Sequence, residues 1–472
     1  METKKKTNEI NNTKRAAIAY IIANLLNKGL SYLTLPIFTR LMTTNQMGVV
    51  TTFSSWQNII YPIVTLSLTS GSINIAFLEY KDRRNEYESN ILTISTITGA
   101  LVLLFTMLFV NPLSKLLLLP KGLVVLLAVI NILNPTLDIW YARQRYEFKY
   151  TKVLGVSVIS SLSSTIISIL AVYYLRNAQN LAVVRLISQY CPILIICALF
   201  YILIMHKGKS YFNKGIWLFA LELSLPLIIH TLSKNILDLS DRLMIAKMCG
   251  NSDAGIYGTV YGISSMALIL WSAMNSALIP DMFGKLENKE YSHLNKLIID
   301  VMVIFGMFSL MITLFAPEVL RILTTAQYYK AVYIMPAIAG GVYLTCVYNV
   351  FGNFLLYRKK SLNIMFATLG AAIVNIIFNF FAIRVFGYMA AAYTTMISFV
   401  ALAIFQGVMV RDSFDSKIID FSKILLVSTV FVLLELLCLL VYHSIIMRFG
   451  FILLVALFLA SNHSKIVAML RR

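Results

Sequence analysis

The sequence predicts an all-α polytopic membrane protein with about 14 transmembrane helices, and three observations lead to this class. First, 59% of the 472 residues are hydrophobic and only 13% are charged, whereas a soluble domain carries about a quarter charged residues. Second, the apolar runs are about 20 residues long and do not alternate with polar residues, which fits membrane helices and excludes barrel strands. Third, Lys and Arg are concentrated in every second gap between these runs.

The apolar runs define the predicted spans in chain order. They cover residues 16–39, 47–76, 90–111, 121–142, 153–175, 181–205, 219–240, 253–279, 297–316, 332–356, 362–385, 389–409, 421–442 and 445–461. The long second run is expected to end in a short surface segment. The boundary between the last two spans is the least defined, because the gap between them has almost no polar residues.

The distribution of basic residues sets the predicted orientation. With the N-terminus in the cytoplasm, 27 of the 40 Lys and Arg residues fall in cytoplasmic gaps and 9 fall in outward gaps. This threefold bias is what the positive-inside rule predicts for a correct span count. We therefore expect both termini in the cytoplasm and no soluble domain in the short gaps on either side.

The net charge is +19. Because the charged residues occupy short gaps between apolar runs, the expected partner is the membrane and not nucleic acid. The five cysteines and five histidines are scattered without metal-ligand spacing, so neither a metal site nor disulfides are expected. The first 15 residues are polar and basic, and the apolar run that follows is too long for a cleavable signal peptide.

Signatures of catalysis are missing from the sequence. It contains no G-x-x-x-x-G-K-[ST] phosphate loop, no G-x-S-x-G elbow and no H-E-x-x-H zinc pair. The chain is therefore not expected to be an enzyme or an ATP-driven pump by itself. No cofactor is expected.

The seventh span carries ionisable residues along one face. His230, Lys234, Asp238 and Asp241 fall within an arc of about 80° on a helix. Ionisable residues inside a membrane mark transport paths or internal pairs. One interpretation is a stripe that lines a cavity, and the other is an internal Lys–Asp pair with Asp241 and Arg242 at the outer interface.

The first span has a similar polar face, formed by Asn24, Lys28, Ser31 and Tyr32. Lys28 lies near the middle of the span, too deep for easy snorkelling, so it either faces a cavity or takes part in a buried pair. A residue such as Arg40, at the end of a span, is more often an interface anchor.

Two further spans carry polar residues. In the fourth, Asp138 shares one side with Asn131, Asn134 and Tyr141, and it could face a substrate path, pair with Lys28 or support helix contacts. The fifth span contains six serines between Ser157 and Ser168, for which close helix packing is the favoured explanation.

A faint internal repeat divides the chain. Lys28 with Thr39-Arg40-Leu41-Met42 is echoed by Lys234 with Asp241-Arg242-Leu243-Met244, at the first and the seventh spans. Repeated halves are common among secondary carriers. The predicted organisation is a basic N-terminus (1–15), a six-helix bundle (16–205), a cytoplasmic linker (206–218), a second six-helix bundle (219–409) and two further helices with a cytoplasmic tail (410–472).

Three segments resemble polysaccharide flippases of the Wzx type. They are LTLPIFTRLMTTNQMGVVTTFSS near the start, RQRYEFKY after the fourth span and DLSDRLMIAKMCGNSDAGIYGTVYGIS in the second half. The resemblance extends over essentially the whole chain. It is specific for the multidrug, oligosaccharidyl-lipid and polysaccharide exporter superfamily more than for a substrate.

The resemblance implies two facing six-helix bundles related by a pseudo-twofold axis, plus two C-terminal helices. It implies a bacterial cytoplasmic (inner) membrane protein that moves an undecaprenyl-diphosphate-linked oligosaccharide by alternating access driven by an ion gradient. Lys28, Arg40, Lys234 and Arg242 match the basic residues of the paired signatures, so they are the implied contacts for pyrophosphate or acidic sugar. Asn24, Ser31, Asp138, His230, Asp238 and Asp241 are the candidate polar lining. Membrane lipids and a polysaccharide polymerase machinery are the implied partners, and the product could be O-antigen, capsule or another polymer.

Two alternatives stay open. A multidrug or small-cation exporter of the same superfamily needs acidic residues deep in its cavity, whereas the deepest ionisable residues in the predicted spans are lysines. A membrane-embedded glycan polymerase or ligase needs a long outward loop with catalytic residues, which none of the gaps provides.

Overall fold

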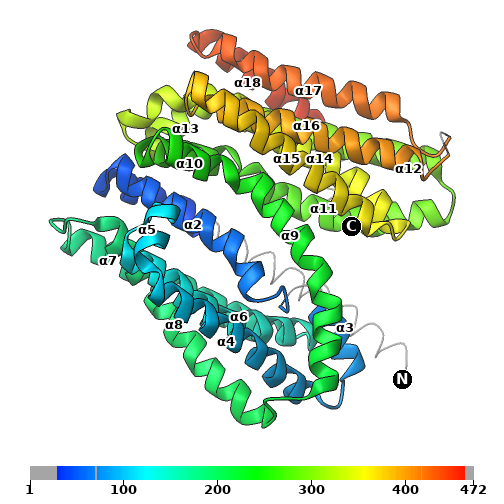
Figure 1. Cartoon of the computed structure of the whole chain (residues 1–472). Coiled ribbons are helices and arrows are strands. Elements are labelled where there is room, and N and C mark those ends of the chain that lie inside the picture. Colours follow the sequence, from blue (N-terminus) through cyan, green and yellow to red (C-terminus); the bar gives the residue numbers. More distant parts are fainter. Residues whose placement is uncertain (1–28, 70–71, 416, 463–472) are drawn as a thin grey trace. The chain divides into compact units, whose positions relative to one another are not determined.

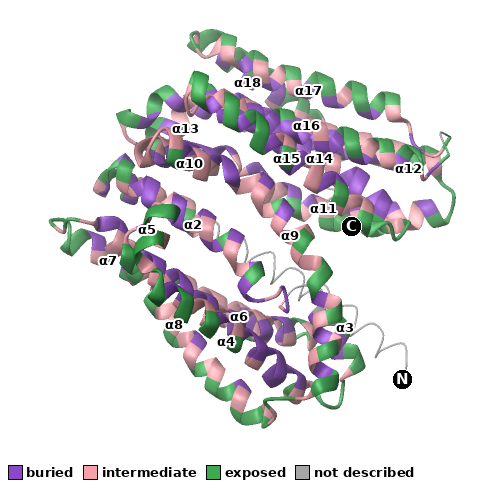
Figure 2. Cartoon of the chain, viewed as in Figure 1, coloured by how far each residue is buried: buried purple, intermediate pink, exposed green. Residues whose placement is uncertain are grey.

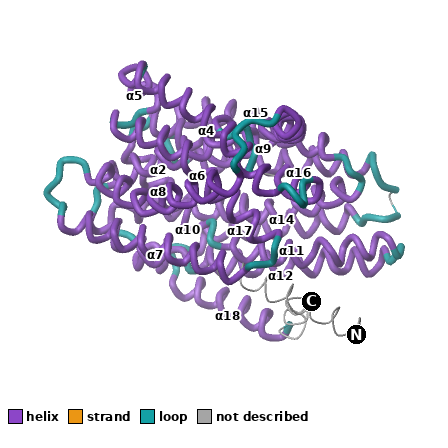
Figure 3. Tube along the Cα trace, turned by 90° about the horizontal axis from the view of Figure 1, so that it is seen from below, coloured by secondary structure: helices purple, strands orange, loops and turns teal. Residues whose placement is uncertain are grey.

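The computed structural model describes residues 29–69, 72–415 and 417–462. Within these ranges the chain consists of helices and connections, without a strand (Figure 3). The predicted all-α polytopic class is confirmed. The chain divides into two compact units between Asn235 and Ile236, which lie within one helix, α9 (Lys214–Met248).

Unit 1 begins with helical residues 29–41. It continues through α2 (Thr44–Val64), α3 (Ser72–Glu79), α4 (Arg84–Leu108), α5 (Val110–Leu117), α6 (Lys121–Tyr146), α7 (Tyr150–Tyr174), α8 (Leu181–Gly208) and the first part of α9. Helices α4, α6 and α8 pack side by side, and α7 packs on α8 (Figure 1). The second predicted span ends early, because α2 stops at Val64 and α3 forms a separate helix.

Unit 2 contains the rest of α9 and ten further elements. They are α10 (Asn251–Ser264), α11 (Ala267–Glu287), α12 (Tyr291–Leu314), α13 (Ala316–Leu323), the 3₁₀ helix η1 (Ala326–Ile334), α14 (Met335–Tyr357), α15 (Ser361–Phe386), α16 (Ala390–Arg411), α17 (Phe421–Val441) and α18 (Ile445–Ser461). Helix α14 packs against α12, α16 and α17 and is the most buried of these helices (Figure 2). Helices α17 and α18 expose apolar faces, as lipid-facing helices do.

In the described part of the chain, ten helices are long and apolar enough to cross a membrane, with η1 and α14 counted as one. An eleventh results if α10 and α11, which meet at 43°, count as one broken span. The first predicted span starts outside the described residues, and α18 has only 17 residues. The exact number of fourteen therefore stays a prediction.

The turn between residues 29–41 and α2 lies in the first segment that resembles polysaccharide flippases, LTLPIFTRLMTTNQMGVVTTFSS. Thr43 caps α2 by accepting a hydrogen bond from the backbone N–H of Gln46 (3.3 Å), and the Gln46 side chain accepts one from the N–H of Thr43 (3.0 Å). This reciprocal capping box satisfies amide groups that the helix itself leaves unpaired. The guanidinium of Arg185 from α8 stacks on the ring of Phe38 (3.7 Å), which brings α8 to this turn.

The RQRYEFKY segment also has a structural role. Arg143 forms ion pairs with Glu88 of α4 (2.8 Å) and with Glu147, and Lys149 pairs with Glu147. Partial burial raises the pKa of Glu147, but hydrogen bonds from Lys149 and Arg143 outweigh burial and leave that pKa below its usual value. The Glu147 carboxylate therefore stays charged at neutral pH and holds Arg143 and Lys149 together, while the Arg143–Glu88 pair joins the end of α6 to α4.

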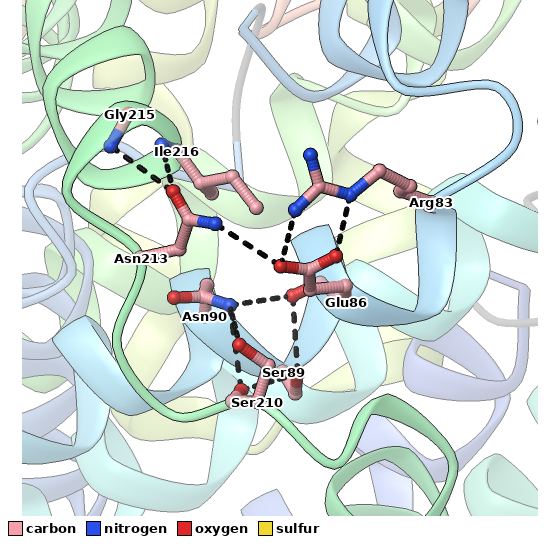
Figure 4. A network of polar contacts seen from close by, with 8 residues as sticks. All are labelled: Arg83, Glu86, Ser89, Asn90, Ser210, Asn213, Gly215 and Ile216. Atoms are coloured by element: carbon pink, nitrogen blue, oxygen red, sulfur yellow. Dashed lines mark hydrogen bonds and ion pairs between the residues drawn. The ribbon is translucent and has the colours of Figure 1, made fainter.

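The connection from α8 to α9 is hydrogen bonded to α4 (Figure 4). Ser89 donates to the carbonyl oxygen of Ser210 (2.7 Å), Asn90 donates to the Ser210 hydroxyl (3.0 Å), and Asn213 donates to Glu86 (3.1 Å). This network gives partners to polar groups of Ser210 and Asn213, which lie in the segment 206–218 predicted as a linker. It holds the start of α9 against α4 within unit 1.

Gly208→Ala should destabilise the protein, because its Cβ would lie 2.3 Å from the Ser89 Cβ and 2.5 Å from the backbone oxygen of Asn85. Relieving such a clash costs about 1–3 kcal/mol. Gly155→Ala is the matched control, since nothing lies within 4 Å of its Cβ and Ala favours helix. Thermal unfolding in detergent should show a lower Tm for the first variant only, and equal Tm values would contradict the close approach.

Candidate functional site

Polar side chains connect α2 and α6 inside unit 1. The Tyr61 hydroxyl donates to the Asp138 carboxylate, and Gln57 Nε2 donates to Asn131 Oδ1 (3.0 Å). Asp138, Asn131 and Asn134 lie on the same side of α6, as the sequence predicts. The structure thus gives Asp138 a described partner, Tyr61, that the sequence did not suggest.

Two pockets flank Asp138 and Asn134, and both lie within unit 1. The first has a volume of about 290 Å³ and is lined by Gln57, Asn58, Tyr61, Pro62, Thr65, Thr69, Asn134, Asp138, Thr231 and Asn235. The second has a volume of about 310 Å³ and is lined by Asn134, Leu137, Asp138, Tyr141, Ser157, Ser160, Ser161, Ser164 and Ile193. Asp138 therefore reaches both pockets from one position on α6.

The lining is rich in neutral hydrogen-bonding groups. Hydroxyls and amides can both donate and accept, as the hydroxyls of a sugar do. Among the described residues, neither pocket has a Lys or Arg in its lining. Packing was the favoured explanation for the α7 serines, but Ser157, Ser160, Ser161 and Ser164 line the second pocket. Small side chains on α7 leave this space open.

The charged residues of α9 lie in different environments. Lys234 is exposed, whereas His230 is partly buried and its Nδ1 is buried without a hydrogen-bond partner. Next to Lys234, Asn235 donates to the backbone oxygen of Asn58 (2.6 Å) and joins α9 to α2. Asp238 is partly buried. The predicted stripe is thus polar along its length but not uniformly open to solvent.

Asp241 is fully buried within unit 2. Its Oδ2 accepts a hydrogen bond from the Tyr257 hydroxyl (2.6 Å), and its Oδ1 accepts one from the backbone N–H of Arg242 (2.7 Å). The Arg242 guanidinium stacks on the ring of Tyr261 (4.4 Å). Both carboxylate oxygens are therefore satisfied by neighbours on α9 and α10.

A neutral network lies beside it in unit 2 and was missed from the sequence. Ser240 donates to Asn375 Oδ1 (3.0 Å), which also accepts from Asn379 (2.9 Å), and Asn375 donates to Thr395 (3.2 Å). All these side chains are buried. The available signal was the pair Asn375 and Asn379 at i, i+4, which places two amides on one face of α15.

A groove of about 860 Å³ runs between α14, α16 and α17 in unit 2. Its walls are mostly apolar, with Val347, Ile404 and Leu433 among the lining residues. Arg411 at the end of α16, and Lys417 and Asp420 on the connection to α17, also line it. The groove thus combines an apolar length with charged groups at one connection.

The remaining candidates are placed as follows. Asn24 and Lys28 lie outside the described residues. Ser31 and Arg40 are exposed, and Arg40 donates to the backbone oxygen of Pro36 (3.0 Å). The expectation that lysines are the deepest ionisable residues stays a prediction, because Lys28 lies outside the described residues; within them, Asp241 and Glu435 are fully buried and Lys234 is exposed. Glu435 was not singled out from the sequence, because a single carboxylate in an apolar run produces no periodic pattern.

The family model described as "Polysaccharide biosynthesis protein" matches residues 13–287, more than half of the chain. The chain belongs to this family. It is similar to a "Capsular polysaccharide biosynthesis protein" of Staphylococcus aureus, at 24% identity over 81% of this chain and 95% of the relative. It is also similar to a "Probable low-salt glycan biosynthesis flippase" of Haloferax volcanii, at 22% identity over 82% of this chain and 80% of the relative.

The fold is shared with a solved flippase. A structure of the lipid II flippase MurJ superposes with a TM-score of 0.68 at 15% identity, covering 96% of this chain and all of that one. The family member is thus a multi-pass membrane protein with the fold of the superfamily that the sequence predicted.

Tyr257→Phe should destabilise the family member by about 1–3 kcal/mol, because it removes the hydroxyl that Asp241 accepts from and leaves a buried carboxylate oxygen unpaired. Tyr261→Phe is the matched control, since it keeps the ring under Arg242. Thermal unfolding in detergent should show a clearly lower Tm for Tyr257→Phe and little change in Tm for Tyr261→Phe. Equal shifts would show that the hydrogen bond to Asp241 carries no stability.

Proposed function

We propose that the protein is a flippase that moves an undecaprenyl-diphosphate-linked oligosaccharide repeat unit across the bacterial cytoplasmic membrane by alternating access, with both termini in the cytoplasm. The observation that carries the proposal is the pair of hydroxyl- and amide-lined pockets around Asp138 in a chain of the polysaccharide biosynthesis family. The names of the two relatives, a flippase and a capsule biosynthesis protein, agree with it.

The sugar is proposed to bind in the unit 1 pockets. Each pocket holds roughly one monosaccharide-sized group by volume, and their hydroxyls and amides replace the water that a sugar loses on leaving solution. Tyr61 and Tyr141 add aromatic edges with hydroxyls. Asp138 accepts hydrogen bonds from sugar hydroxyls at the border of both pockets.

The anionic diphosphate requires cations. Lys28, Arg40, Lys234 and Arg242 remain the proposed contacts, and Arg40 and Lys234 are exposed residues. Membrane lipids and a polysaccharide polymerase machinery are the proposed partners.

Transport against a gradient requires energy, and coupling to H⁺ or Na⁺ is proposed. Acidic groups within membrane helices suit such coupling, because they can bind a cation or a proton. Asp138 of α6, which borders both unit 1 pockets, is the proposed coupling group. We propose a transporter and not an enzyme, and the longest connection between described helices, from Arg411 to Phe421, is short for a catalytic loop.

A multidrug or small-cation exporter is the second candidate. The observation that favours it is the burial of Asp241 and Glu435, since acidic residues inside a carrier bind cationic drugs. Drug sensitivity of a deletion strain that keeps normal surface glycan would favour this candidate, and loss of surface glycan would favour the flippase. Elongation of glycan chains by the purified protein would point instead to a polymerase.

Ser161→Leu should slow flipping by about tenfold, because the larger side chain fills the second pocket and removes one or two hydrogen bonds worth about 1 kcal/mol each. Ser163→Leu is the matched control, since Ser163 lies on the same helix outside that pocket. The measurement is the flipping rate of fluorescent lipid-linked sugars in liposomes. Equal rates for the two variants would remove the pocket from the transport path.

Lys28→Ala and Lys234→Ala should each reduce surface glycan while the protein still inserts into the membrane, because each removes a cation for the diphosphate. Lys247→Ala, an exposed position on the same helix as Lys234, is the control for loss of charge alone. Surface glycan and membrane-inserted protein are quantified together. Full glycan export by the double variant Lys28→Ala/Lys234→Ala would refute the role of these cations.

A further inference from the structure

Helix α17 carries a carboxyl group in the most apolar of the spans that can cross a membrane. Glu435 is 0% exposed, and both of its carboxyl oxygens are buried without a hydrogen-bond partner. It forms no ion pair in the described part of the chain. A group in this state needs an explanation, because native proteins rarely leave buried polar atoms unsatisfied.

The surroundings of Glu435 are hydroxyl groups and not cations. Ser309 and Thr313 of α12 lie beside the carboxyl, and each is 1% exposed. Tyr343 of α14 is fully buried, and its hydroxyl also lacks a hydrogen-bond partner. The other titratable groups near the carboxyl are Cys438 on α17 and Tyr442, the residue directly after α17.

Close packing of α17 on α12 encloses this site. The ring of Phe431, one turn before Glu435, lies so near Gly306 of α12 that a Cβ there would be 2.5 Å from it. The same ring contacts Tyr343, with centroids 5.1 Å apart. Glycine at position 306 therefore lets α17 approach α12 and α14 at the level of the carboxyl.

The far end of α17 is also tied to its neighbours. The Tyr442 hydroxyl donates to the backbone oxygen of Thr313 (2.8 Å). Beyond it, Arg448 of α18 forms an ion pair with Glu318 of α13. The nearest described guanidinium along this path is thus already paired with another carboxylate, and Glu435 is left among neutral groups.

Elementary energetics decides which form of Glu435 fits this site. An ionised carboxylate without a cation in a low-dielectric interior costs several kcal/mol. The neutral acid costs far less and can donate its O–H to a neighbouring hydroxyl. Ser309 and Thr313 stand where such a bond would form.

We infer that Glu435 is a proton-binding site of the C-terminal helices, a carboxylic acid that is neutral while α17 packs on α12 and α14. The reaction is the uptake of one proton from water by the carboxylate and its return to water when the site opens. The ionised form requires hydration, so deprotonation weakens the packing of α17. Protonation thus sets how firmly the two C-terminal helices are held to the rest of unit 2, whatever the cargo of the protein.

The first test is infrared difference spectroscopy of the full-length protein in nanodiscs. The wild type should show the C=O stretch of a protonated carboxylic acid at neutral pH, and Glu435→Gln should lack it. Glu318→Gln is the matched control, because the Glu318 carboxylate is paired with Arg448. Labelling glutamate with ¹³C in the wild type assigns the band to a glutamic acid, and its replacement in Glu435→Asp by a band that the label does not shift assigns it to position 435 even if Glu435→Gln folds poorly.

Two results would overturn the inference. One is the absence of a glutamic-acid band that depends on Glu435 at neutral pH. The other is a band that appears only when Na⁺ is removed at constant pH, since that would make the site a sodium site ringed by the Glu435, Ser309 and Thr313 oxygens. Persistence of the band with and without Na⁺ supports the proton.

Thermal unfolding as a function of pH gives a second readout. The proton is bound in the folded state and stabilises it, so wild-type Tm should be highest at low pH and fall as the pH rises and the proton is lost. Glu435→Gln mimics the neutral acid in shape and should show a flatter profile, while Glu318→Gln should keep the wild-type fall. Parallel profiles for wild type and Glu435→Gln would contradict a proton at this site.

Discussion

Hydrocarbon offers no hydrogen bonds, so each polar group inside a membrane helix has to find its partner within the protein. This constraint explains most of the polar geometry in both units. Asp241 accepts from Tyr257 and from a backbone amide, Asp138 accepts from Tyr61, and Arg448 pairs with Glu318. The side-chain contacts from Tyr257, Tyr61 and Arg448 each join two different helices, so satisfying the polar group also fixes how the helices pack.

The same constraint distinguishes structural groups from groups that are available for function. The carboxylate of Asp241 is saturated by its neighbours, whereas Asp138 borders two pockets and keeps space beside it. Hydroxyls and amides around that space are suited to a polar cargo, because they exchange partners at little cost. Glu435 is the opposite case, a carboxyl without a partner, and a bound proton is the simplest way to satisfy it.

Much of the fold was predictable, because spans are fixed by length and hydrophobicity along the chain. Helices α4, α6, α7 and α8 start and end within a few residues of the predicted runs. The break between α2 and α3 was harder to predict from the sequence, because the chain stays apolar through it. Of the site, the polar side of α6 was predicted, but its partner Tyr61 was not, because α2 and α6 are far apart in sequence.

The sequence by itself determined the membrane class, the sequence ranges of the helices and the polar faces that they carry, because hydropathy and helical periodicity are local properties. Tertiary structure alone decided which of those faces are open and which are sealed. The serines of α7 line a pocket, whereas Asp241 is closed off by Tyr257. In the sequence, the serines and Asp241 both appear simply as polar residues in apolar runs. The physical reason is that burial and partnership depend on which helix lies opposite, and periodicity within one helix holds no information on its neighbour.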